Sequence, residues 1–170
     1  MILRCASLIS VIALHCMAQE VHVSRDSNGV ALGVMAQEPY KLLAGNQKMP
    51  GLLLDCAQRG KKSEHHLSFF PGGPVLNYDS RIIADRQPPL FYMTINGTRT
   101  LTVWTAYRDM VSFTYSARTE KERMKFIQSL LDSVVVSIEF APQVGLPTTS
   151  TFDLSKLRTE INNYPECTVK

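Results

Sequence analysis

The sequence has little of what marks the common functional classes. It has no cluster of basic residues, and its 18 lysines and arginines stand against 15 aspartates and glutamates, so it lacks the charge pattern of a nucleic-acid-binding protein. It has no Gly-x-Ser-x-Gly motif, and the turn at residues 71–74 lacks the lysine of a phosphate-binding loop. Glycine and proline, nine residues each, are too few for a collagen-like or disordered chain. What is present, at 45% apolar and 19% charged residues, is the composition of one globular domain.

The start of the chain has the pattern of a secretory signal peptide. Arg4 is its only charge, residues 5–14 are mostly apolar, and Ala18 offers a small residue before a cleavage site. The apolar run is shorter than the roughly 20 residues of a membrane span. The alternatives are a buried N-terminal helix and a lipid anchor at Cys16, but His15 stands where a lipoprotein signal needs a small side chain. We therefore expect a signal peptide over residues 1–18, a single domain over 19–170, a periplasmic location and no transmembrane segment.

Removal of that leader changes the cysteine count. Of the four cysteines, Cys5 and Cys16 leave with the leader, so Cys56 and Cys167 remain. An even pair in an exported protein predicts one disulfide. The alternatives are a metal-binding pair and a nucleophilic thiol, which fit an oxidising compartment less well. The sequence indicates no cofactor and no metal site.

The sequence predicts an α+β domain, with a mainly antiparallel sheet and two helices in the C-terminal half, because its strands follow one another in runs. Residues 52–57 and 65–70 read as one hairpin, with Cys56 on its first arm. A second hairpin surrounds Asn96 and Gly97. For this turn we predict a three-residue loop, which pairs Phe91 with Leu101, because that register separates polar from apolar side chains better than a two-residue loop does.

Helix signals follow in the second half of the chain. Thr119 and Glu122 form a capping box, and the helix that it opens is expected to have an apolar side made of Met124, Ile127, Leu130, Leu131 and Val134. A strand to Phe140, a last strand over residues 148–152 and a short helix capped by Asp153 complete the prediction. Residues 30–35 are apolar, and their sequence fits a strand or a helix equally well.

Four segments carry a family resemblance. They are an apolar strand ending in cysteine (Leu52–Cys56), an arginine-bearing strand (Arg81–Asp85), a helix (Phe126–Leu131) and a closing segment (Thr149–Leu157) before Cys167. In this order they resemble the VasI-like family of periplasmic accessory proteins associated with type VI secretion. The residues after Cys167 differ from the Gly-Trp that is usual there. The resemblance implies an exported bacterial envelope protein with one disulfide and no established chemistry.

Two groups of residues are candidates for function. His65 and His66 lie on the strand that returns toward Cys56, and either a metal site or a Cys–His nucleophile is conceivable there. Adjacent strand residues point to opposite faces, however, and an oxidised Cys56 has no thiolate, so the simpler interpretation is an exposed polar strand edge. The second group is a candidate partner-binding set of the residue types that dominate protein interfaces, namely Tyr78, Arg81, Arg86 and Tyr92.

These observations favour a non-enzymatic exported accessory or adaptor protein that binds another envelope protein or a cell-wall component. The alternative is a periplasmic inhibitor or immunity protein that blocks a cell-wall hydrolase, since a rigid disulfide-linked domain can enter a cleft at little entropic cost. An enzyme ranks last, because no catalytic set is visible. For Tyr92, and for Trp104 nearby, the competing interpretation is a purely structural role in closing the core.

Overall fold

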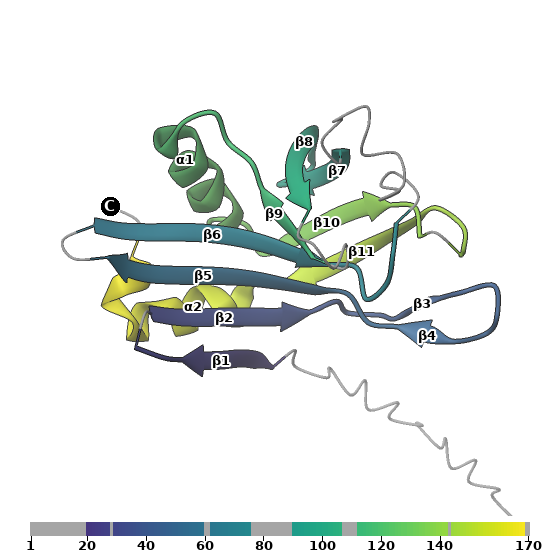
Figure 1. Ribbon diagram of the computed structural model, residues 1–170, viewed down its shortest axis with the longest axis horizontal. Coiled ribbons are helices and arrows are strands. Elements are labelled where there is room, and N and C mark those ends of the chain that lie inside the picture. The colour runs from purple at the N-terminus through teal and green to yellow at the C-terminus, as the bar shows by residue number, and fades with distance from the viewer. Residues whose placement is uncertain are drawn as a thin grey trace, which may run out of the picture.

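The computed structural model describes residues 20–27, 29–59, 62–75, 90–106, 112–142 and 144–168 (Figure 1). The expected leader, residues 1–18, lies outside these ranges. The predicted α+β fold is confirmed, and every strand pairing among the described residues is antiparallel. The strands are β1 (Val21–Arg25), β2 (Gly29–Met35), β3 (Tyr40–Lys41), β4 (Gln47–Lys48), β5 (Gly51–Arg59), β6 (Lys62–Phe70), β7 (Leu90–Ile95), β8 (Thr98–Ala106), β9 (Phe113–Tyr115), β10 (Val135–Phe140) and β11 (Thr148–Asp153). The helices are α1 (Glu120–Leu131) and α2 (Ser155–Glu160), and two 3₁₀ turns follow, η2 (Ile161–Asn163) and η3 (Pro165–Cys167).

The main sheet has nine strands in the order β1-β2-β5-β6-β9-β8-β7-β10-β11. Figure 1 shows β1, β2, β5 and β6 side by side in one layer, while β7 and β8 turn away from it. The sheet curls so that its last strand, β11, approaches its second strand, β2. The contact is a hydrogen bond from the backbone N–H of Gln37, just after β2, to the carbonyl of Thr151 in β11 at 2.8 Å. β11, at one end of the sheet, thus forms a hydrogen bond beyond its pairing with β10, whereas β1, at the other end, pairs with β2 alone among the described residues.

The core lies on the inner face of this curled sheet. Strand alternation puts Leu52, Leu54 and Cys56 of β5 on that face, and each is at least 98% buried. Phe69 of β6 is the hub of an aromatic cluster, with ring centroids 5.3–6.3 Å from its own. Its partners are Phe91, Trp104, Phe140 and Phe152. The apolar residues 30–35, whose structure the sequence left open, form β2 in the same core.

The register of the β7–β8 hairpin differs from our prediction. A two-residue turn at Asn96 and Gly97 connects the strands, with φ angles of 50° and 77°, and Phe91 pairs with Thr102 rather than with Leu101. The prediction was wrong because it assumed that a threonine would not be buried. The Thr102 hydroxyl donates to the carbonyl of Phe91 at 2.7 Å and accepts the indole N–H of Trp104 at 2.8 Å, so burial leaves no polar atom unsatisfied.

Helix α1 begins where its capping box predicts but ends earlier than expected, at Leu131. The Thr119 side chain accepts a hydrogen bond from the backbone N–H of Glu122 at 3.2 Å, and the Glu122 carboxylate accepts one from the backbone N–H of Arg118. Ile127 and two leucines of its last turn are buried as expected. Val134 is not: it is 55% exposed, because the helix ends at Leu131 and Val134 belongs to the connection to β10.

The C-terminal segment returns to the start of the sheet. The N-cap of α2 is Leu154, one position after the predicted Asp153. The Asp153 carboxylate still supports the first turn, because it accepts a hydrogen bond from the backbone N–H of Ser155 at 2.9 Å. On the inner side of this segment, the side chains of Leu157 and Ile161 are buried. Pro165 opens the 3₁₀ turn that ends at Cys167, and this turn brings Cys167 against β5.

Candidate functional site

The two cysteines that follow the expected leader form the predicted disulfide. Cys56 and Cys167 are bonded with their Cα atoms 5.1 Å apart and 111 positions apart in the sequence, and both side chains are fully buried. A buried disulfide sulfur is neither a nucleophile nor a metal ligand in this state. The Cys–His chemistry considered for this strand pair is therefore absent from the oxidised protein.

His65 and His66 point to opposite faces of β6, as the strand periodicity predicts. His65 is paired directly with Cys56 across the hairpin and is only 2% exposed, so the expectation of an exposed polar edge is wrong for this residue. The imidazole of His66 lies on the outer face, 3.9 Å from the carboxylate of Glu64. Among the described residues, no group of three histidine, cysteine or acidic side chains is arranged to hold a metal ion.

The buried imidazole of His65 is held in its neutral form. Neither ring nitrogen has a hydrogen-bond partner in the described part of the chain, and burial lowers the pKa of the ring below its usual 6.5. Smaller effects of the Glu166 and Cys167 backbone and of Glu120 raise the pKa, but they only partly offset the burial. Burial therefore favours the neutral imidazole over the protonated ring as the pH falls.

Stability is expected to depend on pH through this residue. Below pH 6.5 the unfolded chain takes up a proton on His65 that the folded chain resists, so the free energy of unfolding should fall as the pH is lowered through this value. The variant His65→Leu should show a flatter pH profile than the wild type in urea denaturation between pH 7 and 5. Equal slopes for the wild type and His65→Leu would contradict the assignment.

The outer face of the β7–β8 hairpin is apolar. The two-residue turn sends alternate residues of both strands to this face, where four large apolar side chains lie side by side and are each 40–47% exposed. We call this set the outer patch; it consists of Leu90, Tyr92, Leu101 and Val103. The side chains of Phe91 and Trp104, which alternate with them, are fully buried. Trp104 therefore closes the core, whereas Tyr92 lies on the surface.

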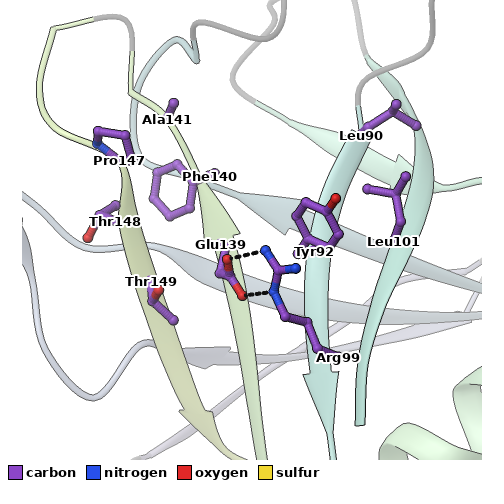
Figure 2. Close-up of a pocket in the computed structure, with 10 residues that line it drawn as sticks. All are labelled: Leu90, Tyr92, Arg99, Leu101, Glu139, Phe140, Ala141, Pro147, Thr148 and Thr149. Atoms are coloured by element: carbon purple, nitrogen blue, oxygen red, sulfur yellow. Dashed lines mark hydrogen bonds and ion pairs between the residues drawn. The ribbon is translucent and has the colours of Figure 1, made fainter.

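An ion pair crosses the outer patch. The guanidinium of Arg99 lies 3.5 Å from the centroid of the Tyr92 ring and donates two hydrogen bonds to the Glu139 carboxylate, at 2.7 and 2.8 Å (Figure 2). Tyr92 and Glu139 face each other because β7 pairs with β10. The hydrogen bonds from Arg99 lower the pKa of the Glu139 carboxyl group. The three side chains thus hold one another in a fixed, solvent-exposed arrangement.

Leu90, Tyr92 and Leu101 of the patch and the ion pair line an open hollow of about 740 Å³. Figure 2 shows Leu90 and Leu101 beside Tyr92, and Pro147 and Thr148 on the far side of Glu139. Apolar side chains with a few fixed polar groups are the usual composition of a binding site. The hollow can therefore position a partner through apolar contact with the patch and through hydrogen bonds to Arg99, Glu139 and the threonine hydroxyls.

Only part of the predicted partner-binding set can be compared with this surface. Tyr92 lies in it, while Tyr78, Arg81 and Arg86 lie outside the described residues. Sequence reasoning missed Arg99 and Glu139, which are 40 positions apart. A bulky side chain alternating with buried ones on β8 was a usable signal for Arg99. For Glu139 the sequence held no signal, because the pairing of β7 with β10 is non-local.

Searches of protein-family models, curated proteins and solved structures found no match to this chain. Within the described residues, no helix is long and apolar enough to cross a membrane.

Proposed function

We propose that this protein is an exported, non-enzymatic accessory or adaptor protein of the bacterial cell envelope, and that it binds another envelope protein or a cell-wall component through the hollow over the outer patch. The observation that carries the proposal is the arrangement of Tyr92, Arg99 and Glu139 among exposed leucines. Tyrosine and arginine dominate the energy of protein interfaces, and here both are held in place before any partner arrives. An ordered surface loses little side-chain entropy on binding.

Four further features support this proposal. The Cys56–Cys167 disulfide suits an oxidising compartment such as the periplasm. The leader pattern of residues 1–18 is the expected route there, and the resemblance to the VasI-like family links such a protein to type VI secretion. Glu139 is engaged by Arg99 and has a lowered pKa, which suits an acceptor of hydrogen bonds better than a general acid.

One observation favours the alternative, an inhibitor or immunity protein for a cell-wall hydrolase. The Asn96–Gly97 turn is exposed at the end of a tightly paired hairpin, and a pre-organised tip of this kind can enter an enzyme cleft. A panel of peptidoglycan hydrolases assayed with the purified protein separates the two functions. Inhibition that is lost when the turn is altered, but not when the outer patch is altered, would favour the inhibitor.

The variant Leu101→Asp tests the proposed binding surface. Leu101 is 47% exposed, so the fold should tolerate the change, whereas a carboxylate in the middle of an apolar contact should weaken binding by about 30-fold or more. The measurement is quantitative affinity enrichment from an envelope extract, followed by titration of the captured component. Val144→Asp, at a valine that is 51% exposed outside the hollow, is the matched control. A captured component that binds wild type and Leu101→Asp equally would refute the assignment of this surface.

A further inference from the structure

A second surface, separate from the outer patch, lies at the free end of the sheet. β1 forms hydrogen bonds with β2 along one side, and no described strand pairs with its other side. The opposite end of the sheet differs, because β11 accepts the backbone hydrogen bond from Gln37. β1 contains neither proline nor lysine, which commonly protect an exposed strand edge, and its one arginine, Arg25, is engaged by Glu166 of the same chain at 3.1 Å. Its backbone is therefore available to add another strand.

Helix α2 stands next to this edge and supplies charged groups. It packs against β1 and β2, and Figure 1 shows it behind β2. A hollow of about 350 Å³ separates the start of β1 from the helix, and it is lined by Glu20, Val21, Lys156, Thr159 and Glu160. Lys156 makes no hydrogen bond or ion pair with another described residue. The Glu160 carboxylate accepts only a long 3.4 Å hydrogen bond from the Tyr164 hydroxyl.

We infer that this edge is a self-association surface, at which β1 of a second copy of the chain pairs antiparallel with β1 and the two α2 helices lie alongside each other. In a two-fold symmetric contact, if one residue faces another across the interface, the reverse contact also forms. Lys156 and Glu160 are one helical turn apart and opposite in charge, so two antiparallel copies of α2 place each lysine near a glutamate of the other copy. The exposed Val23, in the middle of β1, gains apolar cover in this arrangement.

The charges at the hollow favour a second copy of the chain over an unrelated peptide. A peptide of one charge sign would satisfy either Lys156 or the two glutamates of the hollow, whereas a second copy satisfies both signs at once. The contact comprises one short strand edge and one turn of helix, which is small for a permanent dimer. We therefore expect a dissociation constant of about 1–100 μM, and dimerisation would present two outer patches to a multivalent partner.

Sedimentation of the purified full chain over a range of concentrations tests this inference. The wild type should form a dimer that dissociates on dilution. Lys156→Glu and Glu160→Lys each place like charges across the two-fold axis, so each should weaken the dimer by about 10- to 100-fold. Val23→Lys should weaken it as well, because a lysine on an edge strand opposes strand addition. Circular dichroism should show every variant folded, since all three positions lie on the surface.

Mixing the two charge variants separates an interface effect from misfolding. At positions 156 and 160 a Lys156→Glu chain carries two acidic groups and a Glu160→Lys chain carries two basic groups, so the mixture should form a heterodimer although neither variant pairs with itself. The double variant K156E/E160K restores both pairs and should recover the homodimer. Lys121→Glu on α1 and Val144→Lys are controls that should leave the dimer unchanged. A wild type that remains monomeric at about 1 mM, ten times the weakest affinity expected, or single variants that dimerise like wild type, would overturn the inference.

Discussion

Replacing Cys56 and Cys167 together by alanine is expected to lower the free energy of unfolding by about 5 kcal/mol, the largest effect of any change proposed for this protein. The disulfide spans 111 sequence positions, and a cross-link that closes a loop of about this length lowers the entropy of the unfolded chain by an equivalent of about 4.7 kcal/mol. The bond also holds the η3 turn against β5, where both sulfur atoms are fully buried. Stability of this order is comparable to the whole net stability of a small domain.

Urea denaturation with and without a reducing agent measures this effect. The reduced wild type should approach the stability of the double variant, and the reducing agent should leave the double variant unchanged, which serves as the internal control. Reduction should also expose His65, which is paired with Cys56 across the hairpin. A loss below about 1 kcal/mol on reduction would mean that the disulfide contributes no more than an ordinary surface contact.

Phe69→Ala is expected to destabilise the fold by about 3–5 kcal/mol. Phe69 is fully buried at the centre of four edge-to-face aromatic contacts that join β6 to β7, β8, β10 and β11. Its removal leaves a cavity between the two layers of the curled sheet, and the surrounding rings can only partly close it. Chemical denaturation of the variant, compared with wild type at constant pH, gives the difference.

The neighbouring Phe70 provides a matched control. It carries the same side chain on the same strand but points outward and is 36% exposed, so Phe70→Ala should change stability by about 1 kcal/mol or less. Similar losses at the two positions would show that burial on the inner face does not govern the stability of this sheet. The comparison tests the side-chain alternation of β6 as well as the importance of the core.

Much of the secondary structure was predictable because its signals are local. The capping box at Thr119 set the start of α1, two short apolar runs around a turn predicted β5 and β6, and alternating apolar residues predicted β10. The disulfide followed from counting the cysteines that remain after the expected leader. The register of the β7–β8 hairpin was predicted wrongly, since the choice depended on whether Thr102 finds hydrogen-bond partners inside the fold, and those partners come from its tertiary environment.

The candidate site was less predictable than the fold. Tyr92 was selected from its residue type, but its exposure follows from the two-residue turn. The Arg99–Glu139 pair exists because β10 returns to lie beside β7, a contact between segments that no local pattern specifies. The free edge at β1 was likewise invisible, since an edge is defined by which strands fail to come next to it.

By itself, then, the amino-acid sequence determined the α+β class, most strand and helix segments from β5 onward and the cysteine pair, because alternation, capping and composition act over a few neighbouring residues. The tertiary structure alone decided that Tyr92 faces outward, that His65 is buried beside the disulfide, and that β1 ends the sheet. Each of these depends on the pairing of strands far apart in the chain, and that pairing is set by how the whole apolar surface is buried at once.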